Sequence, residues 1–364
     1  MLKCFGMEIS SLSLFNFRNW LDGKIEFGKN INILVGDNAQ GKTNVLEAIF
    51  FCAIGKSTRS RDKELVNFEK ENSKITVFVQ KKFGKTKIEI YLFKKQKKAI
   101  KINGIPISKI GQLMGELNCV FFSPDELKLV KETPEDRRRF LDIHLSQTDK
   151  TYFYLLGTYD KILNNRNKII KNCKIQPQYM ETLPIWNEKL AETASKIIAK
   201  RLQFIQDLKP YAKKVHQTLS NNKEDLCLEY SSNIDVSKDT KQHILDTLEK
   251  NLEKDIALGY TSCGPHRDDL KITLDGKDTK NFASQGQQRS CALSLKLAEL
   301  ELITQSTGEK PILLLDDVFS ELDKSRRAKL LQFAQNYQTI ITCTDIDKIT
   351  TPCKIIKIKN GNIQ

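Results

Sequence analysis

A short segment near the start of the chain has the residue types and the spacing of a phosphate-binding loop. Gly36 and Gly41 enclose four residues, and Lys42 and Thr43 follow directly. In such a loop the glycines let backbone N–H groups face phosphate oxygens, the lysine reaches the β- and γ-phosphates, and the threonine hydroxyl ligates Mg²⁺. The sequence therefore predicts a site for ATP and Mg²⁺. The predicted contact residues are Gly36, Asp37, Asn38, Ala39, Gln40, Gly41, Lys42 and Thr43.

Two consecutive aspartates far along the chain are candidates to complete the magnesium site. Residues 311–315 are apolar, which is typical of a strand buried on both faces of a parallel sheet, and Asp316 and Asp317 follow. Asp316 is predicted to hold Mg²⁺ opposite Thr43, and Asp317 to orient or deprotonate the attacking water. Together with Lys42, these aspartates are the predicted catalytic residues.

Polar residues at two other strand ends are further candidates. An apolar strand predicted at residues 339–343 ends in Thr344 and Asp345, where a γ-phosphate sensor would lie. Arg18 leaves the end of a strand predicted at residues 8–17, from where it could touch the nucleotide. A plain surface arginine is the alternative for Arg18.

A second anion-binding helix start is predicted at residues 284–289, whose sequence is SQGQQR. Ser284 offers a hydroxyl, Gly286 offers an unobstructed backbone N–H, and a long amphipathic helix adds its dipole. One chain thus has two phosphate sites. The simplest account is that this segment binds the γ-phosphate of ATP held by a second copy, so that ATP is sandwiched between two subunits. An ordinary serine-capped helix is the alternative.

The first third of the chain supplies the elements that position the loop. Apolar residues 31–35 predict a strand, and residues 44–52 predict the helix that follows the loop. Their presence disfavours a glycine-rich turn with a chance lysine. Alternating strands at residues 8–17 and 24–27 are expected beside the loop strand. Further alternating strands, followed by a hairpin turn at residues 103–104, predict an antiparallel lobe inserted after the first helix.

The middle of the chain has a helical pattern. Thr133 is predicted to cap a helix with Pro134 at its first position, and apolar stripes continue at helical spacing to about residue 255. We therefore expect an ATPase head in two parts, residues 1–130 and 256–364, interrupted by a helical arm at residues 131–255. A loop at residues 261–269, sequence TSCGPHRDD, is unusual enough to make Arg267 a functional candidate.

Composition favours a polyanionic partner. The 364 residues carry a formal charge of +14, and nine lysines but only one acid fall between residues 81 and 101. Nucleic acid fits this excess better than an acidic membrane face, and no 18-residue apolar run exists to span a bilayer. The start of the chain lacks a secretory signal, which predicts a cytoplasmic protein. Nine cysteines without a C-x-x-C pair are expected to be reduced core residues.

These motifs together resemble a known class. The segments GDNAQGKTN, SQGQQR and LLLDDVFSELD, in this order, are similar to those of the ABC-type ATPase heads of the SMC and Rad50 kind. Within that class, FNFRN, FFSPDELKLVKETPEDRRRFLD and TSCGPHRDD resemble the bacterial RecF family. The implied fold is an α/β ABC-type P-loop ATPase head, with a mixed sheet and an antiparallel lobe, interrupted by a helical arm.

The resemblance also implies a function. Members of this family would dimerise on ATP, bind double-stranded DNA, especially at junctions with single strands, and act with RecR and RecO to load RecA in repair and replication restart. A cytoplasmic, nucleoid-associated protein with DNA-stimulated ATP hydrolysis is expected. The hydrolysis is expected to be slow, because Asp317 is one methylene shorter than the glutamate of transporter heads. The implied residues acting in trans are Ser284, Gln285, Gly286, Gln287 and Arg289, with Asp323 in the dimer loop and Thr344 and Asp345 as the switch.

This chain differs from related proteins at several motif positions, and these differences limit which residue roles the resemblance implies. RecF relatives often have a histidine where this chain has Ser57, Thr58, Arg59 and Ser60. Transporter heads have a glutamine loop and a switch histidine, which this chain lacks. An SMC-like or Rad50-like DNA tether is the first alternative, but it needs long heptad segments that are absent. A small-molecule kinase is the second, but it would not need residues 284–287.

Overall fold

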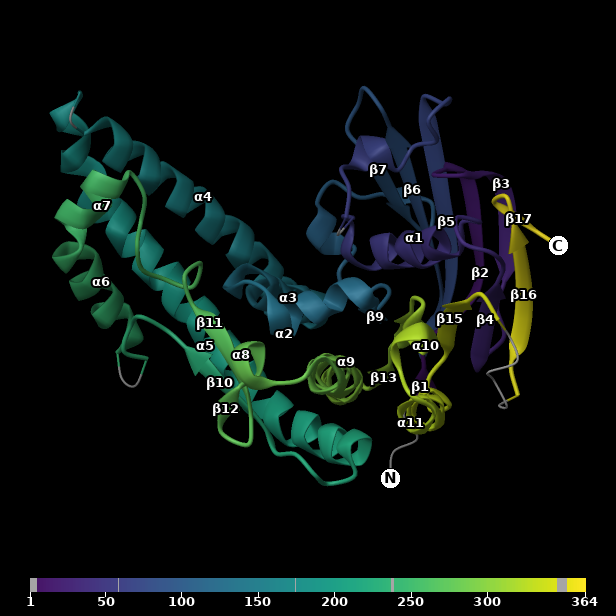
Figure 1. Ribbon diagram of the computed structural model, residues 1–364. Helices are drawn as coiled ribbons and strands as arrows, with labels where there is room; N and C mark the ends of the chain where they lie inside the picture. The colour runs from purple at the N-terminus through teal and green to yellow at the C-terminus, as the bar shows by residue number, and fades with distance from the viewer. Residues whose placement is uncertain (1–4, 58, 174, 237–238, 346–351) are drawn as a thin grey trace. The chain divides into compact units, whose positions relative to one another are not determined.

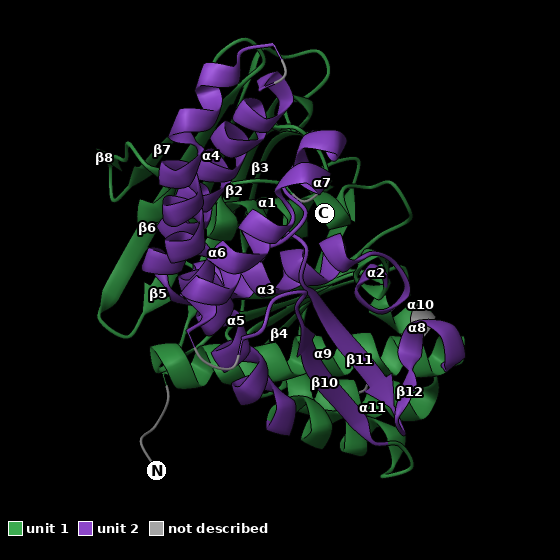
Figure 2. Ribbon diagram, turned by 90° about the vertical axis from the view of Figure 1, so that its left-hand side faces the viewer, with its two compact units in different colours: residues 1–127, 211–224, 284–364 green, residues 128–210, 225–283 purple. Residues whose placement is uncertain are grey.

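The computed structural model describes residues 5–57, 59–173, 175–236, 239–345 and 352–364. The described chain forms two compact units, coloured separately in Figure 2. Unit 1 takes its residues from the ranges 1–127, 211–224 and 284–364, and unit 2 from 128–210 and 225–283. The expected parts were residues 1–130 and 256–364 with an arm at residues 131–255, whereas residues 256–283 belong to unit 2 and residues 211–224 to unit 1.

Unit 1 contains a mainly parallel sheet with the phosphate-loop strand inside it (Figure 1). Its neighbouring strands are parallel except for the antiparallel pair at one edge, β16 and β17. The central strands have no exposed residue, as expected for strands covered on both faces. The order is β17 (Asn362–Ile363), β16 (Lys354–Lys359), β4 (Ile31–Val35), β15 (Thr339–Cys343), β14 (Ile312–Leu315) and β9 (Cys119–Phe122).

An antiparallel sheet forms the second layer of unit 1, and helix α1 (Lys42–Ile54) packs against strands of both sheets. The predicted turn at residues 103–104 joins β7 to β8. The prediction that residues 8–17 and 24–27 lie beside the loop strand was wrong, because both belong to this sheet. Their alternating pattern is typical of a sheet with one buried face. The order is β3 (Trp20–Glu26), β2 (Glu8–Phe17), β5 (Asn72–Lys81), β6 (Gly84–Phe93), β7 (Ala99–Ile102) and β8 (Ile105–Pro106).

Short elements and three helices complete unit 1. Helix α9 (Gln285–Thr307) packs on β9 and on the short strand β13 (Glu309–Lys310), which pairs with β1 (Phe5–Gly6). The remaining elements are η1 (Asp62–Glu64), η2 (Ile110–Gln112), η3 (Pro124–Leu127), α10 (Val318–Glu321) and α11 (Lys324–Ala334). Among the described cysteines, the buried ones are Cys52, Cys119, Cys173, Cys263, Cys291 and Cys343, and all of these are free thiols. Every described helix of the chain is too short or too polar to cross a membrane.

Unit 2 is mainly helical. Pro134 opens α3, and the Asp136 carboxylate accepts hydrogen bonds from the backbone N–H and the hydroxyl of Thr133. The helical pattern predicted up to residue 255 was wrong at β10 (Leu226–Ser231), which pairs with β11. The helices are α2 (Lys128–Lys131), α3 (Pro134–Thr148), α4 (Lys150–Asn172), η4 (Pro177–Thr182), α5 (Leu183–Ser220), α6 (Thr240–Lys250), α7 (Leu252–Leu258) and α8 (Thr279–Phe282). Helix α5 begins in unit 2, and its residues from 211 onward belong to unit 1. The other strands are β11 (Asp269–Leu274) and β12 (Lys277–Asp278).

A buried ion pair ties unit 2 together and leads to a stability prediction. Arg166 and Asp255 are both 0 % exposed, with 2.8 Å between Nη1 and Oδ2. Replacing Asp255 by alanine leaves a buried guanidinium without its counter-ion, so we expect the unfolding free energy to fall by about 3–5 kcal/mol. Urea unfolding followed by circular dichroism measures this. As a control, Glu192→Ala removes an exposed ion pair to Lys196 and should leave the unfolding free energy nearly unchanged. Equal losses in the two variants would contradict the prediction.

Candidate nucleotide-binding site

The loop at residues 36–41 joins β4 to α1 and needs glycine at both ends. Gly41 has φ +101°, and a Cβ there would lie 2.5 Å from Asn19 Oδ1. At Gly36 a Cβ would lie 2.2 Å from the carbonyl oxygen of Ile358 on β16. Larger residues would therefore push the loop away from its neighbours, so the two glycines are required by close approach as well as by backbone conformation.

Lys42 begins α1 and turns its ammonium group back over the loop. Its Nζ donates to the carbonyl oxygens of Gly36, at 2.5 Å, and of Asp37, at 2.7 Å. Burial lowers the pKa of Lys42, while the nearby Cys343, Asp317 and Asp316 act in the opposite direction. An ammonium group held among backbone carbonyls at the N-terminus of a helix is well suited to bind a phosphate, because the phosphate supplies the anionic partner.

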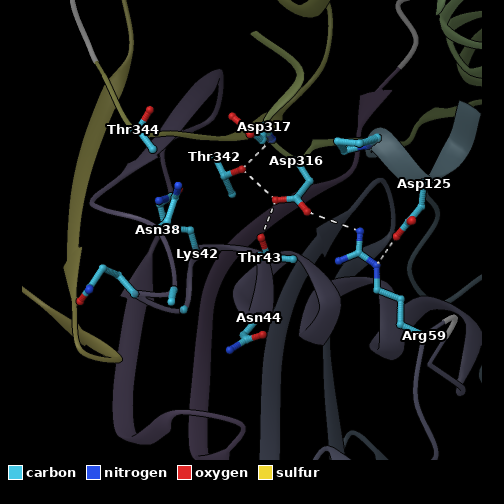
Figure 3. Close-up of a pocket in the computed structure, with 14 residues that line it drawn as sticks. Asn38, Lys42, Thr43, Asn44, Arg59, Asp125, Asp316, Asp317, Thr342 and Thr344 are labelled. Atoms are coloured by element: carbon cyan, nitrogen blue, oxygen red, sulfur yellow. Dashed lines mark hydrogen bonds and ion pairs between the residues drawn. The ribbon is translucent and has the colours of Figure 1, made fainter. Parts of the chain in front are cut away.

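Thr43 and Asp316 meet although they are far apart in the sequence. The Thr43 hydroxyl donates to Asp316 Oδ1 at 2.7 Å, and the Thr342 hydroxyl donates to the same oxygen at 2.9 Å (Figure 3). Asp316 follows β14 and is 5 % exposed. A hydroxyl and a carboxylate side by side are ligands that Mg²⁺ prefers, so this pair could hold the ion as predicted.

Asp317 and the β15 end complete the same edge of the sheet. The backbone N–H of Asp317 donates to the Thr342 hydroxyl at 2.9 Å, and Asp317 has a left-handed backbone with φ +48°. Asp317 and Thr344 both line a pocket of about 470 Å³ over the phosphate loop. Asp345 is exposed and is not among the residues that line this pocket.

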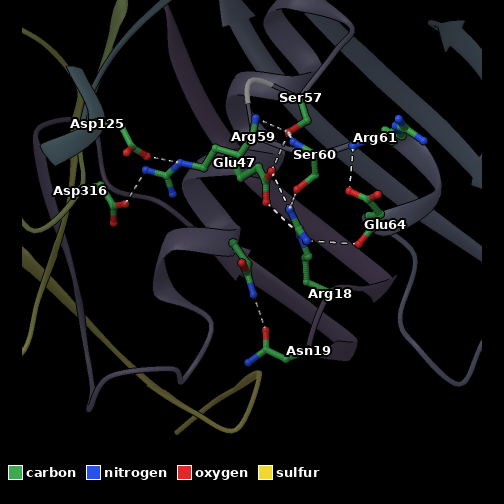
Figure 4. Close-up of polar contacts among 11 residues, drawn as sticks. Arg18, Asn19, Glu47, Ser57, Arg59, Ser60, Arg61, Glu64, Asp125 and Asp316 are labelled. Atoms are coloured by element: carbon green, nitrogen blue, oxygen red, sulfur yellow. Dashed lines mark hydrogen bonds and ion pairs between the residues drawn. The ribbon is translucent and has the colours of Figure 1, made fainter. Parts of the chain in front are cut away.

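Arg59 is a residue of this site that the sequence analysis did not identify. Its Nη2 lies 3.6 Å from Asp316 Oδ2, and its Nε lies 3.0 Å from Asp125 Oδ2 (Figure 4). Arg59, Asp125 and Thr342 all line the pocket. The basic stretch around residue 59 was noted in the sequence, but its partner Asp125 could be found only from the fold. Thr58 lies outside the described residues.

Arg18 lies beside the phosphate pocket and not in it. Its Nη2 pairs with Glu47 Oε1 at 3.0 Å and donates to the Ser60 hydroxyl at 2.7 Å (Figure 4). Together with Asn19 and Asn44, it lines a second hollow of about 850 Å³. Because Asn44 borders both hollows, the second one is a suitable place for the nucleoside of a nucleotide whose phosphates lie in the first.

The residues predicted to act in trans gather on another part of unit 1. Ser284 caps α9: its hydroxyl accepts from Gln287 N at 3.3 Å, and its own N–H donates to Gln287 Oε1 at 2.8 Å. Asp323 caps α11 and pairs with Arg326 at 3.1 Å. Arg326 Nη1 lies 3.4 Å from where a Cβ of Gly286 would be, so the two segments are neighbours.

None of residues 284–289 lines the phosphate pocket of the described chain. Ser284 and Gln285 are exposed, as a contact to a second copy requires, and the Arg289 side chain is half-buried. The serine-capped helix that was considered as the alternative is present, but a capped helix start with an exposed hydroxyl can still bind an anion. The contact in trans stays a prediction.

The candidate functional loop at residues 261–269 lies in unit 2. The His266 ring lies between the Tyr159 hydroxyl, at 2.6 Å from Nδ1, and the Thr261 carbonyl oxygen, at 3.1 Å from Nε2. Burial lowers the pKa of His266 to about 4. Arg267 is exposed and lies over the Tyr260 ring at 4.6 Å. Charged side chains also hold this loop, since Arg137 pairs with Asp269 at 2.6 Å and Arg201 donates to the carbonyl oxygen of Pro265 at 2.6 Å. A role for Arg267 stays a prediction.

Comparisons with known proteins agree with the fold and the site. The family model described as "RecF/RecN/SMC N terminal domain" matches residues 8–363. This family defines the class as an ABC-type ATPase head, which confirms the predicted fold class. The Smc head domain from Pyrococcus furiosus shares this fold with a TM-score of 0.58 at 17 % identity, over 98 % of this chain and 95 % of that one.

More similar proteins specify the family. The DNA replication and repair protein RecF of Ruminiclostridium cellulolyticum is 47 % identical over 98 % of this chain and 99 % of its own. RecF of Clostridium perfringens is 44 % identical over 98 % of this chain and 100 % of its own. A solved structure described as the recombination mediator protein RecF-ATP in the RecFOR pathway has a TM-score of 0.94 at 37 % identity, covering 100 % and 98 % of the two chains. The chain belongs to the RecF family.

Proposed function

We propose that this chain is an ATP-dependent DNA-binding protein of DNA repair. The observation that supports this most directly is the meeting of Thr43 and Asp316, 2.7 Å apart beside Lys42, at the end of the parallel sheet. A Mg²⁺ ion held by this pair would neutralise phosphate charge, and Lys42 would bind the β- and γ-phosphates. A relative that is 37 % identical over nearly its whole length has been solved as RecF-ATP.

In this proposal ATP joins two copies. Residues 284–287 of one copy would cover the γ-phosphate that residues 36–43 of the other hold, and Asp323 would lie at the same interface. Hydrolysis by Asp317 would be slow, because its short side chain reaches less far toward a water molecule, so ATP would act as a timer for the dimer. In the cytoplasm, at the nucleoid, the dimer would bind duplex DNA near single-strand junctions and act with RecR and RecO before RecA is loaded. The RecFOR pathway named for the solved relatives supports this assignment.

Exposed lysines of the antiparallel sheet are the proposed DNA contacts. Within residues 81–101, Lys81, Lys87 and Lys98 pair with carboxylates at 2.8–3.2 Å, so their charges are partly neutralised. Lys82 lies in the exposed turn between β5 and β6, next to Phe83, which is 91 % exposed, and Lys85 is an exposed residue near the start of β6. These two lysines are therefore better placed to meet phosphates than the paired ones.

Salt dependence tests this DNA contact. The logarithm of the DNA affinity should fall with the logarithm of salt by about 0.9 for each phosphate that a lysine neutralises. The double variant Lys82→Gln and Lys85→Gln should reduce that slope by about 1.8, while the control Lys98→Gln should leave it nearly unchanged. Fluorescence anisotropy on duplex and on gapped DNA, with and without Mg²⁺-ATP, measures both. DNA affinity that does not change with ATP would count against the proposed function.

A further inference from the structure

Gln287 of the predicted ATP-contacting segment is held by a side chain from a distant part of unit 1. Its Oε1 accepts the Ser284 N–H at 2.8 Å, which closes the cap of α9. Its Nε2 donates to Glu224 Oε1 at 3.1 Å. One amide group therefore connects the phosphate-facing start of α9 to the segment that follows α5.

Glu224 is in turn held by a fully buried histidine. His216, on α5, is 0 % exposed, and its Nε2 lies 2.9 Å from Glu224 Oε2. The other ring nitrogen, Nδ1, lies 3.0 Å from the Ser294 hydroxyl, which belongs to α9 again. A series of hydrogen bonds thus connects Gln287 on α9, through Glu224 and His216, to Ser294 on the same helix.

The direction of the contact between His216 and Glu224 follows from the chemistry of the carboxylate. An ionised carboxylate can only accept, so His216 donates from Nε2 to Glu224 Oε2. A hydrogen bond to a carboxylate is stronger and more directional than one between neutral groups. The other ring nitrogen meets the Ser294 hydroxyl, which also lies 2.6 Å from the carbonyl oxygen of Ser290. Glu224 is thus held between His216 and Gln287.

We propose that His216 and Glu224 are positioning residues for the ATP-dependent dimer. They fix the Gln287 amide, and that amide keeps Ser284 and the backbone of Gly286 in the orientation that meets the γ-phosphate of ATP on a second copy. Neither residue touches ATP in this account. The inference rests on the proposed function, because it assigns a role to residues 284–287 that only a second copy can use.

Substitutions at Glu224 separate positioning from loss of folding. Glu224→Ala removes the acceptor of Gln287 and should weaken ATP-dependent dimerisation about tenfold or more, since a hydrogen bond to a charged group is lost. Glu224→Gln can still accept from Gln287, and its amide can donate to His216 Nε2 when the ring carries its hydrogen on Nδ1 and donates it to Ser294, so this variant should stay within about threefold of the wild type. Glu301→Ala is the matched control, because Glu301 lies on α9, the helix of Gln287, and accepts from the Tyr337 hydroxyl at 2.7 Å. It should also stay within about threefold, since it is not part of this contact chain.

A second variant tests the same contacts from their other end. Gln287→Leu should weaken the dimer by a similar factor, and the double variant with Glu224→Ala should be no weaker than the Leu variant alone, because the two residues act as one unit. Analytical ultracentrifugation with Mg²⁺-ATP gives the dimer dissociation constants. ATP binding to single copies, measured at low protein concentration, should not change. Gln287→Leu keeps the test available if Glu224→Ala does not fold.

The outcomes distinguish the two proposals. A wild-type chain that stays monomeric with Mg²⁺-ATP removes the proposed dimer, and this inference falls with it. A wild type that dimerises while Glu224→Ala or Gln287→Leu dimerises equally well overturns the positioning role alone. So does a double variant whose loss is the sum of the single losses, or a Glu224→Gln variant as weak as Glu224→Ala.

Discussion

Replacing Lys42 by alanine should reduce ATP affinity about 100-fold or more, because at least two charge-assisted hydrogen bonds of about 1.5–3 kcal/mol each are lost. The side chain is already directed at the loop, with Nζ 2.5 Å and 2.7 Å from two loop carbonyl oxygens. Burial lowers the pKa of Lys42, and a bound phosphate would favour the charged form. ATP affinity should therefore also decrease as pH is raised through the pKa of this lysine. Isothermal titration calorimetry with Mg²⁺-ATP measures both effects.

Lys98→Ala is the matched control for this variant. Lys98 also binds a backbone carbonyl, that of Gly55 at 2.6 Å, and a carboxylate, that of Asp62 at 2.8 Å, but at the opposite end of α1. Its loss should change ATP affinity by less than about threefold, since it lines neither hollow next to the loop. If Lys42→Ala kept wild-type ATP affinity, the loop would not be a phosphate site, and the proposed function would have no basis.

Replacing Ser284 by arginine should abolish ATP-dependent dimerisation while ATP binding to the single chain is kept. The substitution puts a long cation at the positive end of the α9 dipole, two residues before Gly286, whose neighbour is Arg326, so it adds like-charge repulsion as well as bulk. Ser284 does not line the phosphate pocket of its own chain. Light scattering should show that the wild-type mass doubles with Mg²⁺-ATP and that the variant mass does not.

Ser108→Arg controls for the added charge, because Ser108 is an exposed serine in the bend after β8 and is not part of the α9 start. This variant should double its mass like the wild type. A Ser284→Arg variant that still dimerises would show that residues 284–287 do not cover ATP. The serine would then serve only as the cap of its own helix.

The phosphate site could be predicted because its signal is local. The spacing of Gly36, Gly41, Lys42 and Thr43 is a property of eight consecutive residues, and Asp316 directly follows an apolar strand. Parallel strands end at a common edge, so their terminal polar residues meet without any further information. The hydrogen bond from Thr43 to Asp316 agrees with that expectation.

Other features depend on contacts between distant segments and could not be predicted. Residues 226–231 form a strand only because β11 pairs with them, and their short alternating pattern is weak next to the helical stripes on either side. Residues 8–17 have the same local pattern whichever sheet they join. Arg59 was one cation among many until the fold placed Asp125 and Asp316 beside it.

The order in which the chain builds unit 1 has a consequence for its synthesis. The strands of the antiparallel sheet, β2, β3 and β5 to β8, all lie within the first 127 residues, so this sheet can form while the rest of the chain is still being made. The phosphate-loop strand must wait, because Ile31 pairs with Thr339 and Ile33 with Ile355. Such distant pairings close large loops and are slow to form. A nascent or truncated chain would thus expose its lysine-rich sheet before it has a nucleotide site, and ATP would bind only to finished molecules.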